Sequence, residues 1–209
     1  MLLLVVLLSI NGGARNLSVA QTTGELVRRF LPKPAKIETL RTFDPITKTE
    51  THALAAKTGR MNGKDDKYLA FIYNTTDAKK GGHLRLRVVQ NPEGRAAILD
   101  QDLPGTFLWM QAFKTNGFQV LDLNGDGNDE IVTITSEGAS LGAYLNVFTI
   151  RQGKLESILD RPKGYEVDGY AFKFDPVPNG KYRIVISGKD KSSVQIYGWD
   201  GRRFKKISV

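Results

Sequence analysis

A hairpin pattern that recurs three times is the strongest constraint on the fold of this chain. In each copy an alternating strand runs through a glycine-containing turn into a second strand. The three copies are residues 84–99, 144–159 and 193–207. Their turn glycines are Gly94, Gly153 and Gly201, at intervals of 59 and 48 residues. An apolar strand precedes each copy, at residues 67–74, 130–137 and 182–189, and another apolar strand precedes the second and third of these, at residues 118–123 and 170–176.

One unit therefore has roughly four short strands in about 50 residues, which is typical of a β-propeller blade. The alternative is a plain antiparallel meander, whose hairpins look alike because all hairpins do. Recurrence of the order of features favours repetition. Three units are too few for a closed ring, since closed propellers have four or more blades. We expect an all-β fold, either an incomplete or open propeller-like array of about three four-stranded antiparallel units or a twisted sandwich.

The expected domain organisation has three parts. Residues 1–20 are a predicted signal peptide, residues 21–50 a helix with an extended lead-in, and residues 51–209 the β-repeat domain. The unit boundaries fall at about 51–105, 106–162 and 163–209. Thr23 is expected to cap a short amphipathic helix from Glu25 to Leu31, which Pro32 and Pro34 end.

The predicted signal peptide rests on an apolar run from Leu2 to Leu8. This run is shorter than the about 20 residues that a membrane span needs. Small residues at Ser18 and Ala20 suggest cleavage after Ala20. Arg15 and the absence of a cation before the run count against this interpretation, and the alternative is a buried N-terminal strand. We expect a secreted or periplasmic protein without a transmembrane segment after cleavage.

Composition narrows the class of protein and of partner. The chain is 41% hydrophobic and 25% charged, which is typical of a globular protein and excludes a disordered one. It has no cysteine, so no disulfide framework is available. The net charge of +8 predicts attraction to an anionic cell-surface polymer or a protein partner, whereas nucleic acid is not expected outside the cell.

Residues 121–132, LDLNGDGNDEIV, place oxygen-bearing side chains at alternate positions. Calcium takes six to eight oxygen ligands, which a tight loop supplies when alternate side chains converge. The predicted calcium ligands are the side chains of Asp122, Asn124, Asp126 and Glu130 and the backbone carbonyl of Asn128. Gly127 permits the sharp bend. The alternative is a tight solvated turn, but a turn needs two such residues and not five.

Both flanks of this loop read as strands, and an EF-hand would need helices there. The segment resembles the calcium loop of FG-GAP or VCBS-type repeats, which form β-propellers in integrin α chains and many exported bacterial proteins. The family pattern is close to D-x-[DN]-x-D-G-x-x-D before a branched apolar residue, and it implies the same five ligands. Glu130 departs from the usual Asp. Asp129, at position eight, is expected to point away.

Two basic clusters have both a binding and a solvent-face interpretation. His83, Arg85 and Arg87 alternate with apolar residues and would form a basic stripe able to bind an anionic ligand. The second cluster is Arg202, Arg203, Lys205 and Lys206, where lysines on an edge strand would instead prevent aggregation.

The resemblance implies a binding or structural, adhesion-like module in which calcium braces one loop. Catalysis is not expected at that loop, because it offers no open metal position beside a base. The alternative is a glycan-active enzyme that uses clustered carboxylates. Its candidates are Asp65, Asp66, Asp100 and Asp102, and no spacing selects two of them. Trp109 and Trp199 could stack on sugars but are more often core residues in β proteins.

Overall fold

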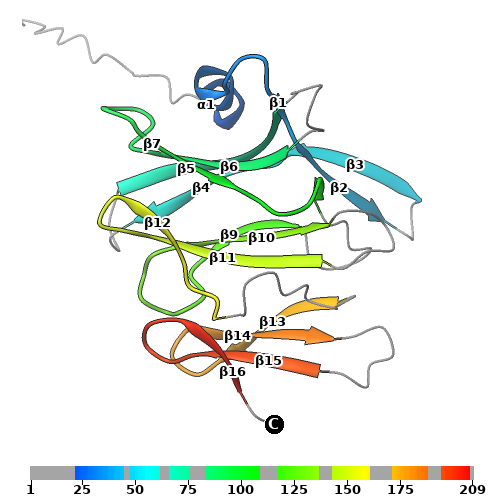
Figure 1. The fold of residues 1–209 in the computed structure, drawn as a ribbon, viewed down its shortest axis with the longest axis vertical. Helices are drawn as coiled ribbons and strands as arrows, with labels where there is room; N and C mark the ends of the chain where they lie inside the picture. The colour runs from blue at the N-terminus through cyan, green and yellow to red at the C-terminus, as the bar shows by residue number, and fades with distance from the viewer. Residues whose placement is uncertain are drawn as a thin grey trace, which may run out of the picture.

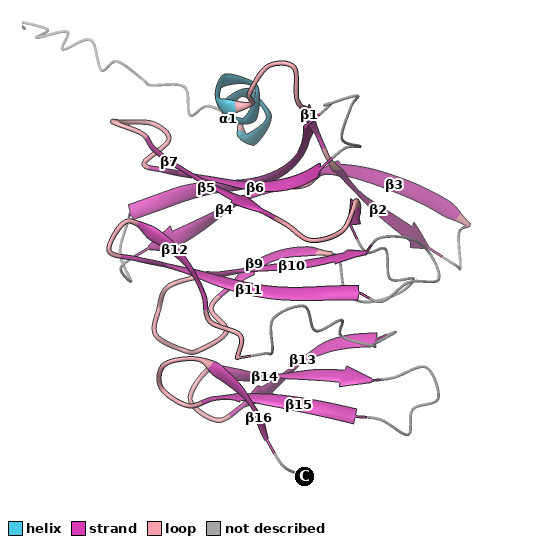
Figure 2. Cartoon of the chain, in the orientation of Figure 1, coloured by secondary structure: helices cyan, strands magenta, loops and turns pink. Residues whose placement is uncertain are grey.

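The computed structural model describes residues 22–44, 48–61, 66–75, 83–108, 117–136, 143–160, 171–187 and 194–207. This part of the chain is mostly β, with one short helix and several antiparallel sheets, none of which is closed. Figures 1 and 2 show three of the sheets as successive layers, with the helix at one end of the stack. The predicted signal peptide lies outside the described residues.

The layers follow the chain in order. The first sheet contains β1 (Lys36–Ile37), β4 (Ala56–Met61), β5 (Asp66–Thr75), β6 (His83–Gln90) and β7 (Ala97–Asp102). The second contains β8 (Phe107–Leu108), β9 (Phe118–Leu121), β10 (Glu130–Ser136), β11 (Ala143–Arg151) and β12 (Lys154–Ser157). The third contains β13 (Ala171–Val177), β14 (Lys181–Ser187), β15 (Val194–Trp199) and β16 (Phe204–Ile207). All pairs within them are antiparallel.

The second sheet is the centre of the molecule, because apolar side chains cover both of its faces. Toward the first sheet, Phe118 and Ile131 join a core cluster with Leu86. Toward the third sheet, Ile134 joins another cluster with Ile184. Every residue of β10 is buried, which explains why its sequence is a nearly continuous apolar and threonine run instead of a clean alternation.

A two-stranded ribbon of β2 (Thr39–Asp44) and β3 (Thr49–Leu54) forms a separate sheet, and Leu40 of β2 joins the core cluster between the first two layers. Residues 51–54 belong to this ribbon, and the four-stranded meander of the first sheet starts at Ala56. The lead-in also supplies β1, which pairs with β5. Two residues are too few to carry a strand signal, and here pairing with a neighbouring edge decides the conformation.

Helix α1 (Thr23–Phe30) covers the outer face of the first sheet. Leu26 and Val27 are buried there against Phe71 and its neighbours. The N-cap is Thr22 and not the expected Thr23. The reason is a capping box: the Thr22 hydroxyl accepts from the Glu25 backbone N–H, and the Glu25 carboxylate accepts from the Thr22 N–H. No helix in the described residues is long and apolar enough to cross a membrane.

Candidate metal centre

The loop of residues 122–129 connects β9 and β10, so strands border it on both sides as the sequence predicts. Gly125 and Gly127 have φ angles of 74° and 87°, in the left-handed region that favours glycine. These two residues bend the chain back on itself within the loop. The four residues of β9 then pair with β10 in register, from Leu121 opposite Glu130 to Phe118 opposite Thr133.

The carboxylates of the loop are turned inward onto its own backbone. The two carboxylate oxygens of Asp122 accept from the N–H groups of Gly125 at 2.8 Å and Gly127 at 2.9 Å. Asp126 Oδ1 accepts from the Asn128 N–H at 2.8 Å. These local bonds are the turns that Asp and Asn side chains make with backbone N–H groups two to five residues on. They gather the side chains of alternate residues on the inside of the bend.

The amide of Asn124 lies between two of the carboxylates. Its Nδ2 donates to Asp126 Oδ2 and to Glu130 Oε1, both at 3.1 Å. Its Oδ1 accepts from the Asp126 N–H at 2.8 Å. The amide nitrogen thus bridges two carboxyl groups at the place where a cation would bind both more strongly.

Glu130 is fully buried at the base of the loop, and its Oε2 accepts from the Leu123 N–H at 2.9 Å. The pKa of Glu130 is raised to about 8, mainly by burial and in smaller part by the nearby Asp126 and Asp122. The hydrogen bond from the Leu123 backbone opposes this shift. At neutral pH the metal-free site therefore holds this carboxyl largely protonated.

Within the described residues, no Lys or Arg nitrogen forms an ion pair with Asp122, Asp126 or Glu130. The same residues contain no group of three His, Cys, Asp or Glu already arranged around a metal position. The donor set nevertheless fits calcium, because carboxylate, amide and backbone carbonyl oxygens are hard ligands. The Asn124 amide would present Oδ1 instead of Nδ2 to the ion. A divalent cation would also supply the positive charge that the three carboxylates lack.

Asp129 points away from the interior of the loop, as predicted, and joins the loop to the first sheet. Its Oδ2 accepts from the Arg60 N–H at 2.7 Å, and its own N–H donates to the Arg60 carbonyl at 3.0 Å. The Arg60 guanidinium reaches the other carboxylate oxygen at 3.3 Å. The hydroxyl of Tyr68 donates to the Asp129 carbonyl at 2.9 Å. Arg60 lies on β4 and Tyr68 on β5, so the contact spans two strands of that sheet.

The opposite side of the loop contacts the third sheet. The Tyr182 N–H donates to the Leu123 carbonyl at 2.9 Å. A Cβ added to Gly125 would lie 2.9 Å from the carbonyl oxygen of Asn179, in the turn between β13 and β14. In this turn Asn179 and Gly180 have φ angles of 68° and 70°. One loop thus bonds to the sheets above and below its own.

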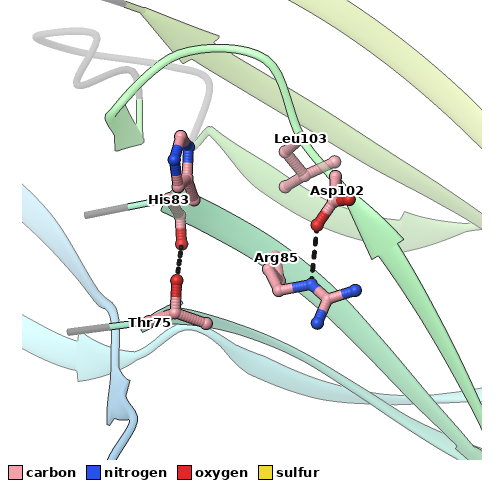
Figure 3. Close-up of a pocket in the computed structure, with 5 residues that line it drawn as sticks. All are labelled: Thr75, His83, Arg85, Asp102 and Leu103. Carbon is pink, nitrogen blue, oxygen red and sulfur yellow. Dashed lines mark hydrogen bonds and ion pairs between the residues drawn. The ribbon is translucent and has the colours of Figure 1, made fainter. Parts of the chain in front are cut away.

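The predicted anion-binding stripe of His83, Arg85 and Arg87 divides into two environments. Figure 3 shows His83 and Arg85 beside an open pocket of about 400 Å³, with Thr75, Asp102 and Leu103. Arg85 Nε lies 2.7 Å from Asp102 Oδ1, so an aspartate on the neighbouring strand already offsets its charge.

Arg87 connects helix α1 to the first sheet. Its guanidinium bonds both oxygens of Asp100, at 2.8 and 2.6 Å, and donates to the Phe30 carbonyl at 2.7 Å. Phe30 is the last residue of α1, so Arg87 fastens the helix to the sheet. The cation lies 5.4 Å from the ring centre of Tyr73.

The carboxylates proposed for glycan cleavage do not form a pair in the described residues. Asp100 and Asp102 each bond an arginine on β6. Asp65, the side chain of Asp66 and Trp109 lie outside the described residues. Trp199 packs on Phe204, with ring centres 5.1 Å apart, as expected of a core residue.

A scan against models of known protein families, a search of curated proteins and a search of solved structures each found no significant match. Sequence reasoning did not find the Arg60–Asp129 contact, because 69 residues separate the partners. No local spacing signals a bond of that range.

Proposed function

We propose that this chain is an exported calcium-binding β-repeat protein that acts as a binding or structural, adhesion-like module, with calcium bracing the loop of residues 122–130. The observation that carries this proposal is a set of three inward-facing carboxylates without a cationic partner in the described residues. Calcium would be held by Asp122, Asn124, Asp126, Glu130 and the Asn128 carbonyl.

The bracing follows from the position of the loop. Asp129 bonds the first sheet, and Leu123 and Gly125 contact the third. An ion that fixes the carboxylates also fixes the backbone between these contacts. Because the metal binds the folded chain and not the unfolded one, it stabilises the contacts among the three sheets as well as the hairpin itself. A single loop of this kind suits the weak calcium sites of extracellular modules, with dissociation constants of about 10⁻⁴ to 10⁻³ M.

The proposed architecture is an open, propeller-like array, and the FG-GAP or VCBS-type resemblance belongs to this proposal. Its support is the order of the strands. Residues 56–102, 118–157 and 171–207 each contain a meander of four antiparallel strands, in the orders β4-β5-β6-β7, β9-β10-β11-β12 and β13-β14-β15-β16. The calcium loop joins the first two strands of the middle meander, and the Asn179–Gly180 turn joins the same two strands of the last.

Thermal melting in calcium and in EDTA tests the proposal. At a hundredfold excess over the dissociation constant, calcium is expected to stabilise the wild type by about 2.7 kcal/mol. The diagnostic variant is Asp126→Asn, which keeps the acceptor for the Asn128 N–H and removes a charge.

The matched control is Asp200→Asn. Asp200 also accepts from backbone N–H groups, those of Arg202 and Arg203 at 2.8 Å, but it lies in the turn between β15 and β16. The control should keep the calcium-dependent stabilisation, while Asp126→Asn should lose most of it. Equal melting of the wild type with calcium and with EDTA would refute the proposed function.

A further inference from the structure

We propose that the outer face of the third sheet is a docking surface for an anionic lipid bilayer. This inference does not depend on the calcium site. Charge is unevenly distributed along the chain. Residues 171–209 contain nine Lys and Arg against three Asp and Glu, a net charge of +6. Residues 22–170 contain 20 against 19, a net charge of +1. Nearly all of the excess positive charge therefore belongs to the segment that forms the third sheet.

The strand register assigns these cations to faces of the sheet. Ile184 and Ile186 are buried against the second sheet, so the residues between them point the other way. The same alternation, followed through the cross-strand pairs, gives the outer face. Its exposed cations are Lys173, Arg183 and Lys205. Lys181 alternates with them but lies against the loop of residues 122–129, since a Cβ on Gly125 would be 3.1 Å from its Cγ. Two of these cations have an acidic partner: Asp175 on the same face pairs with Lys173, and Asp200 in the turn before β16 pairs with Lys205.

Aliphatic side chains lie among these cations. Val185, Ile196 and Ile207 are opposite one another on three adjacent strands. Ile207 is 40% exposed, and Val194, on the same face, is 47% exposed. Ile207 lies across Gly198, since a Cβ there would come within 2.4 Å of its Cδ1. The face therefore has an apolar row with cations around it.

The position of the sheet leaves this face accessible. The third sheet forms the end of the stack opposite α1, and in the described residues no other element covers its outer side. By contrast, α1 covers the corresponding outer face of the first sheet with Leu26 and Val27. A second copy of the chain is a poor occupant, because it would bring one cationic face against another.

Charge complementarity selects an anionic occupant, and the aliphatic row selects a lipid surface over a soluble polyanion. Each Lys or Arg near an anionic membrane strengthens binding about fivefold. Val194 and Ile207 can enter the boundary between headgroups and acyl chains, as apolar residues of surface-bound segments do. A soluble polyanion would use the cations and gain little from the aliphatic side chains.

The test is co-sedimentation of the full chain with vesicles of phosphatidylcholine, alone or mixed with phosphatidylglycerol. The diagnostic variant is Lys173→Gln/Arg183→Gln/Lys205→Gln. The matched control, Lys67→Gln/Arg95→Gln/Lys154→Gln, also removes two lysines and one arginine, at exposed positions on the first two sheets. Both variants have the same net charge, so their difference reports the location of the charges.

We expect the wild type to bind the anionic vesicles and not the neutral ones. The diagnostic variant should bind about a hundredfold more weakly and the control much less so. Val194→Thr/Ile207→Thr should weaken vesicle binding but leave binding to heparin, a soluble polyanion, unchanged. Equal weakening of vesicle binding by both charge variants would overturn the proposal. The proposal would also fail if the wild type bound heparin as strongly as vesicles and the threonine variant bound vesicles as strongly as the wild type. Because a triple variant can fail to fold, wild-type binding is also titrated from about 0.05 to about 0.5 M salt, and insensitivity to salt would equally overturn the proposal.

Discussion

Glu130→Gln is the substitution whose effect on stability should change sign with calcium. The Glu130 carboxyl is fully buried, and its pKa is raised from 4.5 to about 8 by burial and by Asp126 and Asp122. Because the folded-state pKa is raised, the stability linked to its proton is present below pH 4.5 and is lost as the pH rises through about 8. In EDTA, the wild type should therefore lose stability between these two pH values.

The magnitude follows from linkage. Between pH 4.5 and pH 7, a shift of this size removes about 3 kcal/mol from the free energy of unfolding. The amide of the Glu130→Gln variant would not titrate, but it has one acceptor oxygen where the carboxylate has two. The variant therefore keeps one of the bonds from Leu123 N and Asn124 Nδ2 and loses the other, at a cost of about 1 kcal/mol. In EDTA at pH 7, the variant should be more stable than the wild type by about 1 to 2 kcal/mol.

In saturating calcium the order should reverse, because the metal holds the wild-type carboxylate ionised and the amide is a weaker ligand. Urea denaturation at pH 7, in EDTA and in calcium, measures both differences. Destabilisation of the same size by Glu130→Gln in the two buffers would refute the reasoning, since the buried charge would then have no role in metal binding.

Two further substitutions test the interior of the loop and its outer contact. Asn124→Asp replaces the amide that donates to Asp126 and Glu130 at 3.1 Å with a fourth carboxylate. It should lower the free energy of unfolding in EDTA by about 1 to 3 kcal/mol, measured by melting, and strengthen calcium binding, measured by calcium titration. Weaker calcium binding would contradict the assigned ligand set. Gly125→Ala should lower the free energy of unfolding more than Gly153→Ala: both have a positive φ, which costs about 1 kcal/mol, but only Gly125 would place its Cβ 2.9 Å from the Asn179 carbonyl. Equal losses in urea denaturation would show that the loop does not depend on its contact with the third sheet.

The local features of the fold were predictable because they depend on residues close in sequence. Hairpin turns at Gly153 and Gly201 and the strands around residues 122–129 follow from alternation and turn chemistry. The helix was also predicted, but its cap was assigned one residue late. Thr22 and Thr23 both suit an N-cap, and only the three-residue spacing from Thr22 to Glu25 selects the first.

Long-range features were not predictable from one sequence. The alternation in β6 places Arg85 and Arg87 on one face, but only the register with β7 reveals that Asp102 and Asp100 lie opposite them. Residues 99–102 show the same alternation. If the two strands of the hairpin are paired in the sequence, this alternation predicts that the aspartates lie opposite the arginines. The contact of Asp129 with Arg60 and that of Gly125 with Asn179 depend on how sheets stack, and side chains far apart in sequence determine that packing.

The most direct measurement of the central claim is calorimetric titration of calcium into the metal-free chain, with Asp126→Asn and Asp200→Asn in parallel. The inward carboxylates of one loop predict one calcium per chain, lost in Asp126→Asn and retained in Asp200→Asn. Absence of binding to the wild type, or equal binding by Asp126→Asn, would contradict the account.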